Sequence, residues 1–170
     1  WVWSWYGRDS TCSCAILLTF GTAGTDEKLD AAAELGLSVG VNYRTENFAD
    51  VVLEKTNGLG VDVILDVIGA PYWDDNLRSL ATLGRMVVVG SMGGNTLDNA
   101  KLGALGNKRA TVRGTRLRSR TFEEKATVVQ GFAKRVLPLF DRGVLSSIVD
   151  HVFPLEEVAA AHSYMESNTN

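Results

Sequence analysis

Short apolar segments alternate with helix-like segments along most of this 170-residue chain, and that alternation constrains the fold most strongly. The clearest apolar segment, VDVILDVIG at residues 61–69, is almost continuous in Val, Ile and Leu. Such a run indicates a strand that is buried on both faces of a parallel sheet. Strands separated by helices of about ten or more residues indicate βαβ units. The sequence therefore predicts an α/β fold with a doubly wound parallel sheet, in which residues 61–69 and 85–90 form central strands.

The remaining elements are placed by apolar runs and by end signals. Strands are expected at residues 15–20, 38–43, 61–69, 85–90, 110–116 and 147–154. Helices are expected at residues 26–35, 45–56, 71–84, 98–106, 121–141 and 155–167. Gly36 suits the position after the first helix, and Thr45 is the expected N-cap of the second. Pro71 suits the first position of the third helix, and Pro138 is expected to distort the long one.

The first 20 residues do not follow this alternation. WVWSWYGRDSTCSC holds three of the four Trp residues and alternates apolar with polar side chains, which fits an edge hairpin or a disordered lead. We therefore expect an atypical lead at residues 1–20 and the alternating α/β domain at residues 21–170.

Composition excludes several classes of function. The net charge of −3 gives no general attraction to nucleic acid or to anionic membranes. No apolar run approaches the roughly 20 residues that a membrane span needs, and no basic segment followed by an apolar one marks a signal peptide. Cys12 and Cys14 are poorly spaced for zinc, and no His lies near them, so no metal site is expected. So few cysteines favour a cytoplasmic location.

Small residues gather where the expected strands end, which is where doubly wound sheets bind ligands. These segments are residues 21–25, 66–71, 89–95 and 114–120. Small residues let backbone N–H groups face a ligand, although glycines also make tight turns without one. Because several successive strands end in such small-residue segments, a nucleotide site is favoured over simple turns. The basic residues at 108–120 are interpreted as a solvated loop or a small anion contact.

The segment after the second strand carries the sharpest signal. NAD-specific sites end this strand with an acidic residue, whereas here it ends in FGTAGT, at residues 20–25, without an acid. Thr25 can cap the next helix or donate a hydrogen bond to a phosphate. Lys28 lies in the first turn of that helix, where a cation is disfavoured by the helix dipole unless an anion is bound at the N-terminus. Tyr43 and Arg44 could close the site. The alternative is that Lys28 pairs with Asp26, Glu27 or solvent.

Several of these segments together resemble a known family. TAGTDEKLDAAAELG, VNYRTENF, VDVILDVIGAPYW, LGRMVVVGSMGG and RLRSR resemble, in order and spacing, the cofactor domain of the NADPH-dependent quinone oxidoreductases. These form a zinc-independent branch of the medium-chain dehydrogenase/reductases. The resemblance extends from about Gly21 to Asn170, and it implies that residues 21–170 form a dinucleotide-binding domain that is incomplete at both ends.

The resemblance implies a cofactor, a reaction and site residues. NADP(H) would be bound, with its 2′-phosphate held by Thr25, Lys28 and Tyr43. The other cofactor-binding residues implied are Ile68, Gly69, Gly90, Met92, Gly93, Leu117, Arg118, Ser119 and Asn168. The reaction would be hydride transfer from NADPH to a quinone in a homodimer, without nucleic acid, membrane or metal as partner. The resemblance identifies no catalytic residue in this chain.

The chain departs from the resembled family in three places. The family's catalytic domain precedes this region, and nothing like it is present here. A first strand with a glycine-rich diphosphate loop is expected near residues 1–14, where the sequence does not match, and the family's last strand would follow residue 170. We therefore expect the chain to be inactive alone. Two other interpretations stay open: a nucleotide-binding or interaction module without activity, and the cofactor domain of a related alcohol dehydrogenase or enoyl reductase.

Overall fold

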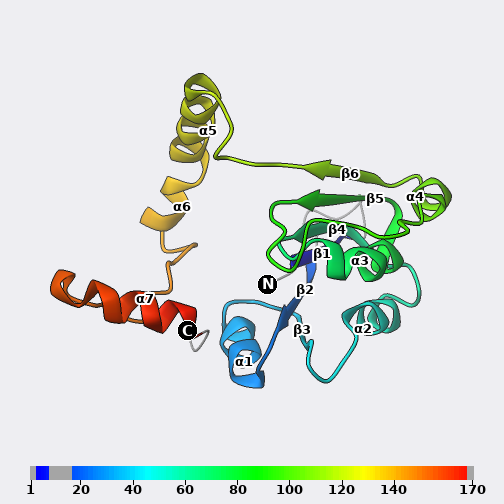
Figure 1. Cartoon of the computed structure of the whole chain (residues 1–170), viewed down its shortest axis with the longest axis horizontal. Helices are drawn as coiled ribbons and strands as arrows, with labels where there is room; N and C mark the ends of the chain where they lie inside the picture. Colours follow the sequence, from blue (N-terminus) through cyan, green and yellow to red (C-terminus); the bar gives the residue numbers. More distant parts are fainter. Residues whose placement is uncertain (1–2, 8–16, 168–170) are drawn as a thin grey trace. The chain divides into compact units, whose positions relative to one another are not determined.

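The computed structural model describes residues 3–7 and 17–167, the first of these ranges by its backbone alone. The chain divides into two compact units, Trp1–Arg118 and Ser119–Asn170. The first unit holds the sheet and the second holds helices (Figure 1).

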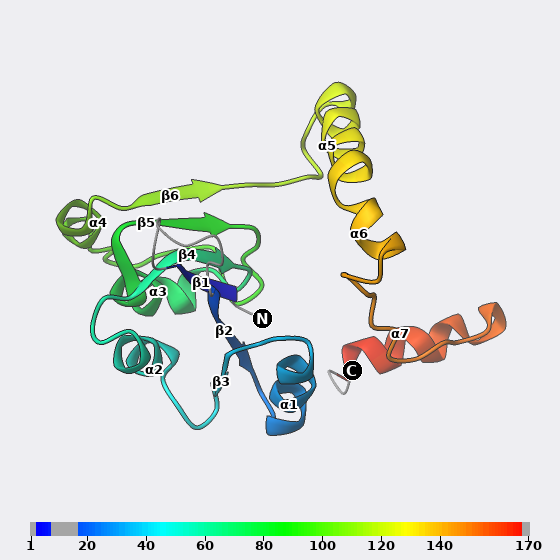
Figure 2. The ribbon, with the colours of Figure 1, turned by 180° about the vertical axis from the view of Figure 1, so that it is seen from behind.

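A six-stranded sheet organises the first unit, in the order β3-β2-β1-β4-β5-β6 (Figures 1 and 2). Its strands are β1 Trp3–Gly7, β2 Leu17–Ala23, β3 Val39–Asn42, β4 Val61–Asp66, β5 Leu80–Val88 and β6 Thr111–Gly114. The pairs β2–β3, β4–β5 and β5–β6 are parallel, as the sequence predicts. Strands β4 and β5 occupy inner positions, which confirms the central place expected for both.

Strand β1 is the exception, because it runs antiparallel to both of its neighbours. Trp3 pairs with Gly21 on β2 and with Leu65 on β4, near the carboxyl ends of those strands. At its other end, Gly7 pairs with Leu17. The edge hairpin considered from the sequence is therefore wrong in position. β1 fills an inner slot, since the β2 and β4 backbones need a partner between them.

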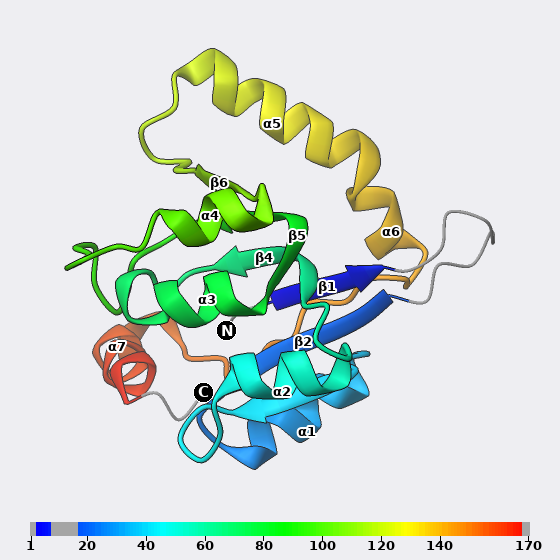
Figure 3. The ribbon, with the colours of Figure 1, turned by 90° about the vertical axis from the view of Figure 1, so that its right-hand side faces the viewer.

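Helices cover both faces of the sheet, as a doubly wound fold requires (Figure 3). The helical segments of the first unit are α1 Asp26–Glu34, α2 Phe48–Lys55, η1 Ala70–Tyr72, α3 Trp73–Ser79 and α4 Gly103–Lys108. On one face, α1 packs so closely that a Cβ on Gly40 would lie 3.1 Å from Leu29. On the other face, Ile64 and Met86 of the sheet pack with Val52 of α2 and Leu77 of α3 in one buried cluster.

The start of α2 differs from the sequence prediction. Its N-cap is Asn47, not Thr45, and the Asn47 Oδ1 atom accepts hydrogen bonds from Ala49 N at 2.9 Å and Asp50 N at 3.3 Å. The Asn47 amide also donates to Asp75 of α3 at 2.8 Å. Asn47 therefore satisfies the first turn of α2 and ties it to α3, which a Thr two residues earlier cannot do.

Replacing this cap gives a direct test of the helix start. We expect Asn47→Ala to lower the free energy of unfolding by about 1–2 kcal/mol, because the first-turn amides lose their acceptor. Urea unfolding followed by Trp fluorescence measures the change. Thr45→Ala is the matched control, and its effect should stay within about 0.5 kcal/mol. A larger effect at Thr45 than at Asn47 would contradict this helix start.

The helix predicted at residues 71–84 is also too long. Pro71 does begin a helical segment, in η1, but α3 ends at Ser79 and β5 begins at Leu80. Leu80 is fully buried and pairs with Val61, so sheet pairing overrides the local helical preference. Lys108 of α4 donates through Nζ to the carbonyls of Arg78 and Leu80 and holds this junction. Burial lowers the Lys108 pKa, and Lys108 is therefore part of the packing rather than of a solvated loop.

The second unit consists of α5 Phe122–Arg135, α6 Leu137–Asp141, η2 Leu155–Glu157 and α7 Val158–Glu166. Thr121 and Glu124 form a reciprocal capping box at the start of α5. The break between α5 and α6 confirms the distortion expected at Pro138. The strand predicted at residues 147–154 is wrong: among the described residues of this unit no strand forms, so this segment has no strand within the unit to pair with.

No helix in the described part of the chain is both long enough and apolar enough to cross a membrane.

Candidate functional site

The ends of β2 and β3 bring together the first group of predicted site residues. The backbone N–H of Tyr43 donates to the carbonyl of Ala23 at 3.1 Å, which joins the two strand ends. A Cβ built on Gly24 would lie 2.6 Å from the Tyr43 hydroxyl, so the phenol lies directly against the Gly24 backbone. Only glycine leaves room for this contact.

The first turn of α1 begins beside this contact. Thr25 is the N-cap, and its Oγ1 atom accepts a long hydrogen bond, 3.5 Å, from the backbone N–H of Lys28. The Asp26 carboxylate accepts from the Asn42 amide at 2.8 Å. Thr25, Lys28 and Tyr43 therefore gather around one helix N-terminus, where an anion is stabilised by the helix dipole.

The loops that follow β4 and β5 form a second group, and they are hydrogen-bonded to each other. Met92 N donates to the Val67 carbonyl at 3.1 Å, and Gly93 N donates to the Ile68 carbonyl at 2.9 Å. Ala70 N in turn donates to the Gly94 carbonyl at 2.9 Å. We call residues 66–71 and 89–94 the paired loops, because each supplies hydrogen bonds to the other.

Asp66 accepts hydrogen bonds from the first residues of both paired loops. Its side chain is almost fully buried, and Oδ1 accepts from the backbone N–H groups of Ile68 at 2.8 Å and Gly69 at 3.0 Å. Its backbone carbonyl accepts from Val89 N at 2.7 Å. One residue at the end of β4 therefore fixes the start of both loops.

This pairing corrects one expectation about the site. The sequence suggests that backbone N–H groups of the glycine-rich loops face a ligand, but those of Ile68, Gly69, Met92 and Gly93 are used within the protein. What the paired loops offer to a ligand is their shape, their remaining carbonyl oxygens and exposed side chains such as Met92. The glycines are needed for the close approach of one loop to the other.

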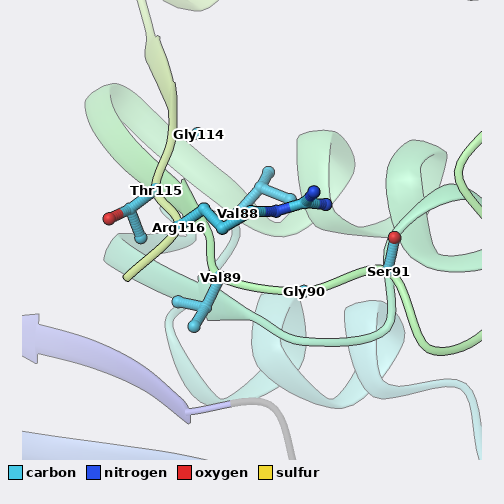
Figure 4. Close-up of a pocket in the computed structure, with 7 residues that line it drawn as sticks. All are labelled: Val88, Val89, Gly90, Ser91, Gly114, Thr115 and Arg116. Carbon is cyan, nitrogen blue, oxygen red and sulfur yellow. The ribbon is translucent and has the colours of Figure 1, made fainter. Parts of the chain in front are cut away.

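A pocket of about 340 Å³ lies between the ends of β5 and β6 (Figure 4). Its lining residues are Val88, Val89, Gly90, Ser91, Gly114, Thr115 and Arg116. Figure 4 shows the Arg116 side chain extending past Val88 from the end of β6. Arg116 belongs to the basic segment singled out in the sequence, and among the described residues predicted as cofactor-binding only Gly90 lines this pocket.

The remaining predicted residues follow β6 in the chain. Leu117 and Arg118 follow β6 at the exposed end of the first unit. Ser119 begins the second unit, and Asn168 lies outside the described residues.

Tyr72 is the residue that the sequence analysis missed. Its ring packs on Phe48, with 5.0 Å between ring centroids. Burial raises the pKa of the Tyr72 phenol, and the charges of Tyr43, Asp66 and Asp75 raise it further, whereas a hydrogen bond with the Thr22 side chain lowers it. Tyr72 thus lies among residues from the ends of three strands. The only sequence signal was its place in a short segment directly after a strand end.

Taken together, the fold is that of a Rossmann-type nucleotide-binding domain. A family model described as "Zinc-binding dehydrogenase" matches residues 35–170, and the chain belongs to this family. This confirms the resemblance to the medium-chain dehydrogenase/reductases. In the described part of the chain no group of three or more His, Cys, Asp or Glu side chains could hold a metal ion, so the described residues do not fit a zinc site.

Individual relatives and solved structures agree with this assignment. The chain is 35% identical to a 2-haloacrylate reductase of Burkholderia sp. over 150 residues, covering 85% of this chain and 43% of that protein. It superposes on Escherichia coli quinone oxidoreductase complexed with NADPH with a TM-score of 0.72 and 29% identity, covering 89% of this chain and 46% of the other. For a Pseudomonas syringae quinone oxidoreductase the TM-score is 0.73, with 28% identity and coverage of 89% and 46%. The chain therefore spans less than half the length of these relatives.

Proposed function

We propose that this chain is the NADP-binding part of an NADPH-dependent oxidoreductase that reduces quinones. The observation that carries the proposal is the match, over 89% of the chain, to a quinone oxidoreductase complexed with NADPH. The geometry at the end of β2 supports it, because no acidic residue ends that strand and Thr25, Lys28 and Tyr43 surround the α1 N-terminus.

Within this proposal the residues bind and orient the cofactor, which supplies the hydride when bound. Lys28 and Tyr43 contact the 2′-phosphate, and Thr25 positions the first turn of α1. The paired loops, with Ile68, Gly69, Gly90, Met92 and Gly93, give a rigid surface for the ribose and nicotinamide. The resemblance adds Leu117, Arg118, Ser119 and Asn168 as further residues that would contact the cofactor. The complete protein would be a cytoplasmic homodimer.

The electron acceptor has a second candidate. The relative from Burkholderia sp. is a 2-haloacrylate reductase, whose substrate has a carbon–carbon double bond next to a carboxylate. An activated alkene is therefore the alternative to a quinone. Either acceptor would need to lie about 3–3.5 Å from the nicotinamide for hydride transfer. The part of the relatives that this chain does not match is the part we expect to hold it there.

The proposal predicts binding without turnover for these 170 residues. Titration with NADPH, followed by its fluorescence, should show saturable binding that is stronger than that of NADH. Absorbance at the reduced-nicotinamide band should stay constant after a simple quinone or 2-chloroacrylate is added. Absence of NADPH binding at millimolar concentration would overturn the assigned cofactor. Rapid NADPH oxidation would show that these residues bind the electron acceptor themselves, and it would overturn the expectation that the part of the relatives outside this match does so.

A further inference from the structure

Apart from Gly90, the residues of the pocket between the ends of β5 and β6 have no part in the cofactor contacts proposed above. Thr115 N donates to the Val88 carbonyl at 2.9 Å, which extends the β5–β6 pairing one residue beyond β6. The backbone from which the Arg116 side chain starts is therefore fixed. Arg116 is cationic, and no Asp or Glu is among the described residues that line the pocket. The charge at this pocket thus favours an anion.

The Arg116 guanidinium is available to a ligand. The side chain is exposed, and among the described residues it has no ion-pair partner. Figure 4 shows the guanidinium reaching from the end of β6 past Val88 toward Ser91. A guanidinium presents its N–H donors in a planar fork that matches the two oxygens of a carboxylate.

Ser91 supplies two more donors to the same pocket. Its backbone carbonyl accepts from Gly94 N at 3.1 Å, but within the described part of the chain neither its N–H nor its hydroxyl has a hydrogen-bond partner. The N–H groups of the next two residues, Met92 and Gly93, are used within the protein. Ser91 can therefore donate to a bound molecule from the side of the pocket opposite to the end of β6.

We propose that this pocket binds the carboxylate of an anionic electron acceptor, with the Arg116 guanidinium as the main contact and Ser91 as a second donor. The inference rests on the proposed function, in which the loop containing Gly90 faces the nicotinamide. Because Gly90 also lines the pocket, a molecule bound there would lie next to the nicotinamide. Val88 and Val89 give apolar surface to its carbon skeleton. The acceptor class is then an unsaturated carboxylic acid rather than an uncharged quinone.

The experiment compares two probes that differ at one group. Cinnamate carries a carboxylate, and cinnamamide carries an uncharged amide in its place. NMR titration of the 170-residue chain, followed at the backbone amide signals of Gly90 and Gly114, measures both affinities at this pocket. The part of the relatives outside this match would hold the rest of the acceptor, so both affinities should be weak.

The expected result is a preference for the carboxylate that depends on Arg116. The wild type should bind cinnamate at least tenfold more tightly than cinnamamide, as for a hydrogen bond to a charged group. In Arg116→Leu the two affinities should agree within about twofold, because the remaining donors of Ser91 serve either probe.

Arg113→Leu is the matched control. Arg113 lies on β6, is exposed and is not among the residues that line the pocket. Its removal makes the same change in net charge, so the carboxylate preference should persist. Adenosine 2′,5′-bisphosphate should bind equally well to the wild type and to Arg116→Leu, since the proposed ligand of Arg116 is not a phosphate of the cofactor. Urea unfolding checks that both variants fold.

Each outcome bears on the proposal. Equal affinities for the two probes in the wild type, or no binding of either, would overturn it. An equal loss of preference in both variants would show a general effect of charge and would also overturn it, as would a loss of adenosine 2′,5′-bisphosphate affinity in Arg116→Leu. NADPH binding without a carboxylate preference contradicts this inference alone. An Arg116-dependent preference without NADPH binding supports the carboxylate site and contradicts the proposed function alone.

Discussion

Gly69→Ala is expected to lower the free energy of unfolding of the first unit by about 3–5 kcal/mol, because strain and steric overlap act together. Gly69 has φ 88° and ψ −133°, a region that residues with a Cβ rarely adopt. A Cβ at this position would also lie 2.5 Å from the Gly94 carbonyl oxygen and 2.9 Å from Ser91 Cα. Both neighbours are backbone atoms of the opposite loop, so they cannot rotate away.

Gly58→Ala is the matched control. Gly58 has a similar φ of 80°, but a Cβ there would meet nothing within 4 Å. Its substitution should therefore cost only the backbone strain, about 1–2 kcal/mol. Urea unfolding of both variants separates the two effects. Equal losses of stability would show that the paired loops are not in the close contact described here.

Lys28→Ala is expected to reduce the preference for a 2′-phosphate at least tenfold, since a hydrogen bond to a charged group contributes about 1.5–3 kcal/mol. Lys28 lies in the first turn of α1, beside the Gly24–Tyr43 contact. The measured quantity is the ratio of the affinities for adenosine 2′,5′-bisphosphate and for 5′-AMP. These two ligands differ only at the 2′ position, so the ratio isolates the contribution of the 2′-phosphate.

The control for this variant is Lys55→Ala. Lys55 ends α2 on the surface, where it pairs with Glu54 at 3.1 Å. Removing it makes the same change in net charge at a place far along the chain from α1. The 2′-phosphate preference should survive in Lys55→Ala. An unchanged ratio in Lys28→Ala would refute the role proposed for Lys28.

Much of the fold follows from local sequence patterns. The apolar runs at residues 61–69 and 85–90 predict β4, the second part of β5 and the central place of both strands in the sheet. The errors arise where a residue's secondary structure depends on a partner that is distant in the sequence. Leu80 joins a strand because Val61 lies beside it, and Asn47 becomes a cap because α3 lies within reach. The segment at residues 147–154 has strand-like composition but no strand partner among the described residues of its unit.

The site shows the same division. Thr25, Lys28 and Tyr43 can be chosen from the sequence, because each lies next to a strand end and parallel strands bring such ends to one edge. Tyr72 could not be predicted as a site residue in this way, since its interactions with Thr22 and Asp66 depend on where the fold places η1. The sequence also could not predict that N–H groups of the paired loops form hydrogen bonds within the protein, because their acceptors lie in the opposite loop.

The reversed direction of β1 has a consequence for the order of folding. A parallel neighbour of β2 would need a long crossover connection, whereas an antiparallel one closes as a hairpin between segments adjacent in the chain. Hairpins form within about 1–10 μs, well before pairings between distant segments. β1 and β2 can therefore pair early and present a two-stranded edge on which β4 later docks. Assembly of the first unit would start at this local nucleus, with the slower β1–β4 pairing completing the sheet.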